Sequence, residues 1–192
     1  MNCTAVAEEA RAAAGLSHAE LTLAAAAVPP GCQGVNFLPY LAGERTPNWP
    51  HATGALLGLR PGHLANHALV YRAVLEGVTF TLLAGMNRLK GLGCKVEELR
   101  VVGGGSKNGL WCQIIADAFG VPVRLPVEGA ETAALGAALQ AAAVAAGERV
   151  GDYVAAHEPK MLDQVIVPNM VSTAAYTEAF KRHVELGEKL FA

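Results

Sequence analysis

The stretch Leu99-Arg100-Val101-Val102-Gly103-Gly104-Gly105-Ser106-Lys107-Asn108 decides the fold of this chain. Its apolar start predicts a short strand over 99–102, and the three glycines predict a tight turn over 103–105. The apolar pattern that follows predicts a helix over 108–119, ended by Gly120. Glycines let a backbone approach a ligand closely, and a helix start favours a phosphate. The stretch therefore indicates either a phosphate-binding turn or a plain strand-to-helix connection.

A second strand and a second helix follow this unit. We expect the strand over 121–125 and the helix over 131–146, in a sequence rich in small apolar residues. The order strand–turn–helix–strand–helix implies an α/β core with crossover connections. Residues 148–172 are predicted to be irregular, and 173–191 to form an amphipathic terminal helix.

Upstream of the glycine turn, the chain predicts three helices and a loop. An alanine-rich helix is expected over 4–14, and Ser17 opens the next helix with a capping-box spacing to Glu20. A long helix is expected over 63–90, where apolar residues recur near helical spacing. The segment 35–49 mixes apolar residues with prolines and charges, which is typical of a strand that runs into a functional loop.

Two common nucleotide motifs do not fit the glycine turn. A dinucleotide fingerprint requires glycine at position 108, where Asn108 stands, and a P-loop requires Gly-Lys-Ser/Thr, whereas Ser106-Lys107 has the reverse order. The next strand ends in Arg124-Leu125-Pro126, which lacks the acidic residue of a Rossmann-type NAD site. Asn108 suits either a helix cap or a hydrogen bond to a purine edge.

Composition argues against several classes of protein. A net charge of −2 without a run of Lys or Arg disfavours nucleic acid binding. Four scattered cysteines without a CxxC pair suggest reduced thiols in a cytoplasmic protein. We expect no membrane-spanning helix and no signal peptide. His63 and His67 lie four residues apart but lack a third ligand, so no metal site is expected.

A set of stretches, in this order along the chain, resembles the FGGY family of carbohydrate kinases, and among them the xylulokinases most. These stretches are FLPYLAGERTP (37–47), GALLGL (54–59), RAVLEG (72–77), GGGSKN (103–108) with WCQIIAD (111–117), ETAALGAA (131–138) and the terminal helix (176–190). The first also resembles, with small changes, the corresponding loop of gluconokinases. The similarity covers nearly the whole chain, so residues 1–192 are expected to form one C-terminal, nucleotide-binding domain.

The resemblance implies an α/β fold of the actin-like ATPase (ribonuclease H-like) class and transfer of the γ-phosphoryl of Mg-ATP to a sugar hydroxyl. The expected cofactors are ATP and Mg²⁺, and the favoured conversion is D-xylulose to xylulose 5-phosphate, with gluconate or another sugar as the alternative substrate. By this likeness Gly104, Gly105 and Asn108 contact adenosine and the α-phosphate, while Gly103 and Ser106 shape the turn. Phosphoryl transfer of this kind depends mainly on positioning and electrostatic stabilisation.

Glu44 and Arg45 are candidates to face the cleft between the two domains of such a kinase. An ion pair that braces their loop is the alternative, and it would contribute little if exposed.

The resemblance also implies that an N-terminal sugar-binding domain is absent, because family members are expected to be about twice this length. The general-base aspartate belongs to that half. The chain contains only Asp117, Asp152 and Asp163, all of which follow the glycine turn in the sequence. We therefore expect the isolated chain to be inactive or very weak. The alternative is a non-catalytic nucleotide-binding or partner-binding module, for example a homodimer joined through exposed apolar surface.

Overall fold

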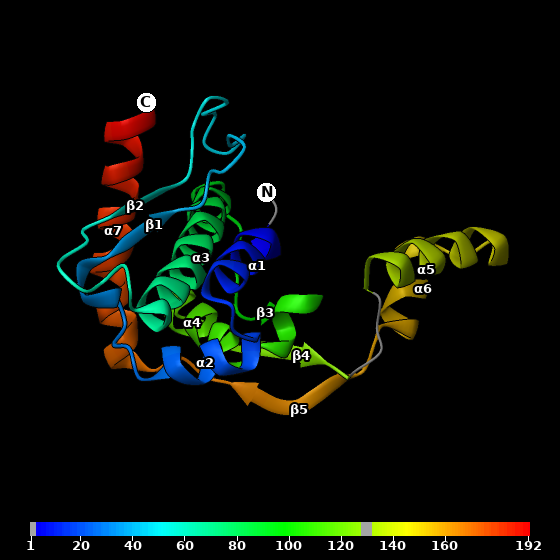
Figure 1. The fold of residues 1–192 in the computed structure, drawn as a ribbon. Coiled ribbons are helices and arrows are strands. Elements are labelled where there is room, and N and C mark those ends of the chain that lie inside the picture. The colour runs from blue at the N-terminus through cyan, green and yellow to red at the C-terminus, as the bar shows by residue number, and fades with distance from the viewer. Residues whose placement is uncertain (1–2, 128–131) are drawn as a thin grey trace.

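The computed structural model describes residues 3–127 and 132–192 and has an α/β architecture (Figure 1). The described elements in chain order are α1 (Cys3–Ala14), α2 (His18–Ala26), η1 (Cys32–Gly34), β1 (Asn36–Leu38), β2 (Ala55–Leu57), α3 (His67–Gly91), β3 (Leu99–Arg100), η2 (Gly104–Lys107), α4 (Gly109–Phe119), β4 (Val123–Pro126), α5 (Thr132–Ala146), α6 (Val150–His157), β5 (Met161–Ile166) and α7 (Met170–Phe191).

The unit β3–α4–β4 confirms the crossover predicted from the sequence. Strands β3 and β4 are parallel, with Leu99 opposite Val123 and Arg100 opposite Arg124. Parallel neighbours require such a crossover, and α4 supplies it. The predicted helix over 108–119 begins one residue later, with Asn108 as its N-cap, and Gly120 ends it in the left-handed region with a φ of 67°.

The prediction that residues 148–172 are irregular is wrong. They form helix α6 and strand β5, and β5 pairs with β4 in the antiparallel sense. Strand β5 lies at the edge of the three-stranded sheet, and its middle residues are exposed. It therefore lacks the regular alternation of buried and exposed residues that identifies a strand.

The predicted capping box of α2 is present. The Ser17 hydroxyl accepts a hydrogen bond from the backbone N–H of Glu20 at 3.2 Å, and the Glu20 carboxylate accepts one from the Ser17 N–H at 2.8 Å. These two bonds satisfy donors that a helix start leaves free. They fix where α2 begins, and α2 forms one wall of the cavity described below.

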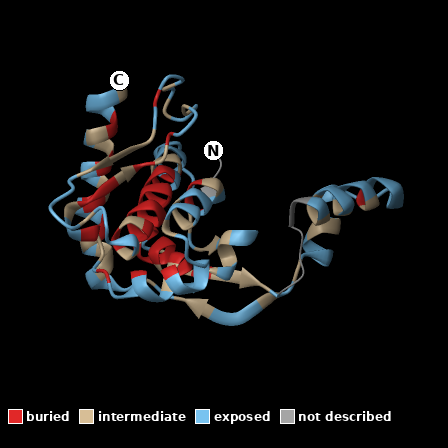
Figure 2. Cartoon of the chain, viewed as in Figure 1, coloured by how far each residue is buried: buried red, intermediate tan, exposed pale blue. Residues whose placement is uncertain are grey.

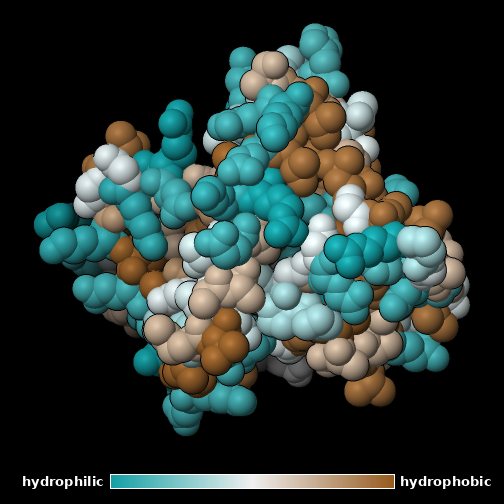
Figure 3. Space-filling view, turned by 90° about the vertical axis from the view of Figure 1, so that its left-hand side faces the viewer, coloured by the Kyte–Doolittle hydropathy of each residue, from teal (hydrophilic) through white to brown (hydrophobic). Residues whose placement is uncertain are grey.

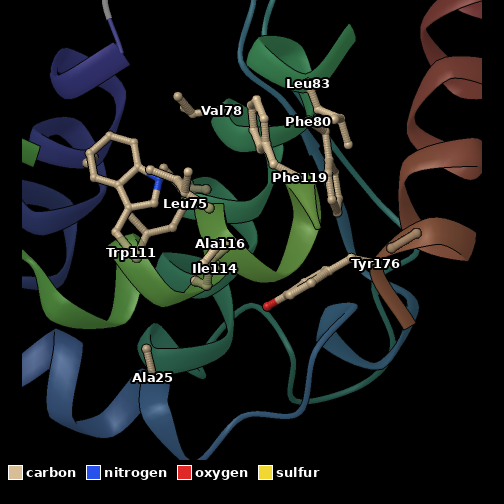
Figure 4. Packing of buried hydrophobic residues seen from close by; sticks show 14 of the residues in the cluster. Ala25, Leu75, Val78, Phe80, Leu83, Trp111, Ile114, Ala116, Phe119 and Tyr176 are labelled. Atoms are coloured by element: carbon tan, nitrogen blue, oxygen red, sulfur yellow. The ribbon is translucent and has the colours of Figure 1, made fainter. Parts of the chain in front are cut away.

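Helix α3 is the centre of the hydrophobic core. Figure 2 shows it as the main run of buried residues, with α1, α2, β1, α4 and α7 packed around it. Leu75, Val78 and Phe80 of α3 meet α4 residues including Trp111, Ile114 and Phe119, and Tyr176 of α7 closes the cluster (Figure 4). Each fully buried side chain of this size contributes about 1.5–3 kcal/mol relative to exposure.

Gly77 lets the backbone of α3 lie close to β1. A Cβ atom at this position would overlap the carbonyl group of Phe37. Glycine at this position therefore permits a close contact between a helix and a strand. By length and composition, α3 is the one described helix that is apolar enough to cross a membrane, but 78% of its most apolar stretch is buried inside the fold. We interpret α3 as a core helix.

A buried polar network joins α3 to its neighbours. The Arg72 guanidinium donates to Glu76 at 2.9 Å, to the Tyr176 hydroxyl at 2.8 Å and to the carbonyl of Ala25 at 3.1 Å. Glu76 also accepts hydrogen bonds from the N–H of Gly31 and from Tyr176. Burial raises the pKa of the Glu76 carboxyl, and the hydrogen bonds and charge of Arg72 oppose that rise. The network ties α2, the turn that follows it, α3 and α7 together.

One part of the chain extends from this core. Helices α5 and α6 pack on each other and project away from the remaining elements (Figure 1). The β1–β2 hairpin lies beside α7, on the side seen in Figure 3, where brown hydrophobic patches are separated by teal hydrophilic side chains. Strand β2 falls in the GALLGL stretch, for which the sequence predicted no secondary structure.

His183 makes folding of this chain sensitive to pH. Its side chain is buried, with Nδ1 lying 3.0 Å from the Asn36 amide oxygen and Nε2 lying 3.4 Å from the Tyr40 hydroxyl. Burial lowers the pKa of His183 to about 4. In the unfolded chain the pKa of a histidine is about 6.5. As the pH falls, the unfolded chain therefore takes up a proton at His183 before the folded chain does.

We expect the His183 contribution to be fully present above about pH 6.5 and to be lost progressively towards pH 4. The free energy of unfolding should fall by about 2 kcal/mol between pH 7 and pH 5 from this residue. Urea unfolding at both pH values checks this, with His183→Gln as the control that should show a much smaller difference. Equal pH dependence in the two proteins would contradict the assignment.

Candidate nucleotide site

The glycine turn is held in shape by Gly103 and Ser106. Gly103 has a φ of 78° and a ψ of −165°, a region that residues with a side chain rarely adopt. The Ser106 hydroxyl donates to the Gly103 carbonyl at 2.7 Å, and the Ser106 N–H donates to the same oxygen at 3.1 Å. In this structure these two hydrogen bonds and the backbone of Gly103 set the shape of the turn.

Two residues of α4 pack against the glycine turn. The Cys112 thiol is buried and lies 3.5 Å from the carbonyl oxygen of Ser106. The ring of Trp111 packs under Gly105, and the Trp111 indole N–H donates to the Thr79 hydroxyl of α3 at 3.0 Å. The turn is thereby tied to the core helix.

A cavity of about 990 Å³ lies between the glycine turn and the first two helices. Its lining comes from α1 (Thr4, Ala5, Ala7, Glu8), α2 (His18, Ala19, Thr22, Leu23), α3 (Tyr71), the turn (Gly104, Gly105, Lys107, Asn108) and α4 (Gly109, Trp111). A mostly apolar lining with a few convergent polar groups is typical of small-molecule sites. Gly104, Gly105 and Asn108 line this cavity, whereas Gly103 and Ser106 stand behind it.

The residues of this cavity fit a nucleotide. A Cβ at Gly104 would meet no protein atom within 4 Å, so the absence of a side chain leaves open space at the cavity wall. In an i to i+3 turn, the N–H groups of Gly104 and Gly105 have no acceptor within the turn. Lys107 adds an exposed cation at the same edge. Free N–H groups beside a cation suit phosphate oxygens.

Asn108 caps helix α4 in this structure. Its Oδ1 accepts a hydrogen bond from the Trp111 N–H at 3.0 Å. Its Nδ2 donates to the Thr22 hydroxyl at 3.0 Å and to the Tyr71 hydroxyl at 3.3 Å. The structure therefore shows Asn108 as a helix cap. Its contact with adenosine stays a prediction, and both Nδ2 hydrogens are already used within the protein.

A polar row continues from Tyr71 across the cavity wall. The Tyr71 hydroxyl lies 2.8 Å from Nδ1 of His18, and Nε2 of His18 lies 3.0 Å from the Glu8 carboxylate. Burial raises the pKa of the Tyr71 phenol, so the hydroxyl keeps its hydrogen at neutral pH. Hydrogen bonding from Arg11 lowers the pKa of Glu8, whose side chain is exposed. Sequence analysis missed this row because its members come from three separate helices.

Glu44 and Arg45 lie in a different cavity, of about 530 Å³. Ala5 of α1 lines both this cavity and the nucleotide cavity. The Glu44 carboxylate accepts hydrogen bonds from the N–H groups of Arg45 at 2.8 Å and of Thr46 at 3.2 Å. Glu44 therefore braces the loop through the backbone, and the described residues show no ion pair between Glu44 and Arg45. Arg45 is exposed, and its role in a cleft between two domains stays a prediction.

The WCQIIAD stretch also has a structural role. Asp117 is buried and accepts hydrogen bonds from the Gln113 side chain and from the N–H of Asn169, each at 2.7 Å. Asn169 in turn caps α7. Asp117 thus helps to fix the start of α7.

Two further sequence-based expectations concern Glu131 and a metal site. Glu131, the first residue of the predicted second helix, lies outside the described residues. Among residues 3–127 and 132–192, no group of three or more His, Cys, Asp or Glu side chains is placed to hold a metal ion.

Gly105 and Gly104 should respond differently to the same substitution. A Cβ at Gly105 would lie 3.0 Å from the Trp111 ring, which is buried and hydrogen-bonded, whereas Gly104 faces open space. We expect Gly105→Ala to lower the free energy of unfolding by about 1–3 kcal/mol, and Gly104→Ala to change it little. Urea unfolding of both variants checks this, and equal losses would show that Trp111 does not support the turn.

Comparisons with known proteins show the family to which this chain belongs. Residues 2–145 match the model of the FGGY family of carbohydrate kinases, C-terminal domain. Xylulose kinase of Escherichia coli (strain K12) is 37% identical over 173 residues, which are 88% of this chain and 35% of that protein. A crystal structure described as a "xyloylose kinase" from Brucella ovis superposes with a TM-score of 0.84 at 32% identity, over 97% of this chain and 38% of that chain.

Gluconate kinase from Lactobacillus acidophilus has a similar structure, with a TM-score of 0.81 at 27% identity over 96% of this chain and 37% of that chain. The chain thus spans little more than a third of these relatives, a smaller share than the half expected from the sequence. It corresponds to their C-terminal part, and the α/β fold of the actin-like class is that of these sugar kinases. From the matched model and these relatives, we conclude that the chain belongs to the FGGY family of carbohydrate kinases, as a C-terminal domain.

Proposed function

We propose that this chain forms the ATP side of a sugar kinase that transfers the γ-phosphoryl group of ATP to a hydroxyl of D-xylulose. The observation that carries the proposal is the cavity in which a glycine turn with free N–H groups faces helices α1 and α2. ATP supplies the phosphoryl group, and Mg²⁺ offsets the charge of its phosphates.

The residues of the chain act by binding and orienting. The N–H groups of Gly104 and Gly105 face the phosphates, Lys107 balances their charge, and the apolar wall of Ala5, Ala19 and Leu23 excludes water from the base. Such groups stabilise the charge that spreads over the phosphoryl oxygens during transfer. In this arrangement the chain contributes electrostatic positioning and leaves proton removal from the sugar to another group.

The general base comes from the part of the relatives that this chain does not span. Of the two carboxylates beside the cavities, Glu44 is bound to the backbone of its own loop, and Glu8 belongs to the row with His18 and Arg11. Loss of a general base typically lowers a rate about 10²- to 10⁴-fold. We therefore propose that the chain alone binds nucleotide but phosphorylates sugar very slowly.

Helix α5 offers a surface for the remaining part of such a kinase. It packs mainly on α6, and Val144 is 72% exposed among alanines that are also exposed. An exposed apolar helix face of this kind commonly marks a contact with a partner. We propose that the sugar-binding part of the complete kinase covers it.

D-xylulose is the favoured substrate because the loop 37–47 resembles that of xylulokinases and the curated relatives named above include a xylulose kinase. A sugar acid is the second candidate, since a gluconate kinase has nearly the same structure over this chain.

Nucleotide binding tests the proposal directly. We expect Mg-ATP at 100 times its Kd to raise the free energy of unfolding by about 2.7 kcal/mol. Gly104→Val should abolish most of this gain, because its side chain enters the open space at the cavity wall. Gly151→Val on α6, where a Cβ also meets no atom within 4 Å, is the matched control and should keep the gain. A thermal-unfolding titration measures all three proteins, and no gain in the folded wild-type chain would refute the proposal.

A further inference from the structure

The cavity wall carries one continuous row of hydrogen-bonded side chains. The row runs from Asn108 to Tyr71, His18 and Glu8, with Thr22 as a side branch at Asn108. Its members come from α1, α2, α3 and the start of α4, and all five line the cavity. Nucleotide contacts by the glycine turn do not require such a row, so its presence needs its own explanation.

The row has a consistent direction when His18 is neutral and carries its hydrogen on Nε2. Asn108 donates both Nδ2 hydrogens, one to Thr22 and one to Tyr71. Because the Tyr71 oxygen accepts there, its own hydrogen is free to go to Nδ1 of His18. A neutral His18 then carries its hydrogen on Nε2 and donates it to Glu8. In this arrangement the donors on Asn108 Nδ2, on the Tyr71 hydroxyl and on His18 Nε2 each have an acceptor within the row.

Only one orientation of the Asn108 carboxamide fits this row. Turning the amide over would place Nδ2 against the Trp111 N–H, which needs an acceptor for the cap. Asn108 is also the residue where the glycine turn ends and α4 begins, and its own N–H donates to the Gly105 carbonyl at 3.1 Å. The position of its side chain therefore controls how the turn meets the helix.

Thr22 and Tyr71 attach Asn108 to the opposite side of the cavity. Thr22 lies on α2 and Tyr71 on the buried face of α3, so their bonds to Asn108 span from the turn to the facing wall. These two bonds set the distance between the turn and α2.

We propose that Thr22 and Tyr71, with His18 behind Tyr71, are positioning residues for nucleotide binding: they lock the Asn108 carboxamide and hold the glycine turn at a fixed distance from α2. The proposal rests on the nucleotide site proposed above. It assigns a role in binding to residues that need not touch the nucleotide themselves.

Either hydroxyl alone can accept a hydrogen bond from Asn108 Nδ2. Loss of both hydroxyls should therefore weaken binding more than the two single losses suggest. We expect Thr22→Val and Tyr71→Phe each to weaken Mg-ATP binding by no more than about threefold, and the double variant to weaken it at least about tenfold. Thr22→Ser combined with Tyr71→Phe keeps one acceptor and should bind like the Tyr71→Phe single variant. Isothermal titration calorimetry with Mg-ATP on the 192-residue chain measures each Kd.

The matched control is the double variant Thr177→Val and Tyr153→Phe. It removes one threonine and one tyrosine hydroxyl, as the test variant does, but from α7 and α6, outside the cavity. It should bind Mg-ATP like the wild-type chain. A folded double variant of Thr22 and Tyr71 with wild-type affinity would overturn this inference while leaving the nucleotide site intact. Absence of Mg-ATP binding by the wild-type chain would overturn the site itself, and this inference with it.

A measurement on the wild-type chain keeps the inference testable if the double variant does not fold. Both Nδ2 hydrogens of Asn108 are bonded within the protein, so they should exchange slowly with water in ¹⁵N-edited NMR spectra. The exposed side-chain amide of Gln140 on α5 provides the fast-exchanging reference. Exchange of the Asn108 side chain as fast as that of Gln140 would overturn the inference.

Discussion

The buried ion pair between Arg72 and Glu76 is the constraint on which the remaining structure depends. Two charges removed from water are stable only when neighbouring groups complete their hydrogen bonds, and here Ala25, Gly31 and Tyr176 do so. Loss of one partner from such a pair costs about 3–5 kcal/mol, because the other charge stays buried. The pair therefore requires α2, the turn after it and α7 to hold fixed positions around α3.

The candidate nucleotide site is a consequence of that arrangement. One wall is α2, whose last turn is held by Arg72 through the Ala25 carbonyl. The other wall is the glycine turn, which rests on Trp111 and through it on Thr79 of α3. Both walls are thus anchored to the same core helix, α3. Phosphoryl transfer depends on binding groups that are held in fixed positions, and this anchoring supports such positioning.

Local patterns predicted the features that local interactions control. The strand, turn and helix around 99–119 and the capping box at Ser17 follow from neighbouring residues, and the structure contains both. Strand β5 was missed because an exposed edge strand has no regular pattern of burial. The polar row at the cavity was missed because Asn108 meets Tyr71 and Thr22 across 37 and 86 residues, and Tyr71 meets His18 across 53. No local signal in the sequence marks such long-range contacts.

The central claim is that nucleotide binds between the glycine turn and helices α1 and α2. A crystal structure of the chain with Mg²⁺ and a non-hydrolysable ATP analogue tests this claim most directly. The account predicts density for the analogue in the 990 Å³ cavity, with its phosphates against Gly104 and Gly105. Density in the cavity beside Glu44 and Arg45, or an empty glycine turn at saturating analogue, would contradict it.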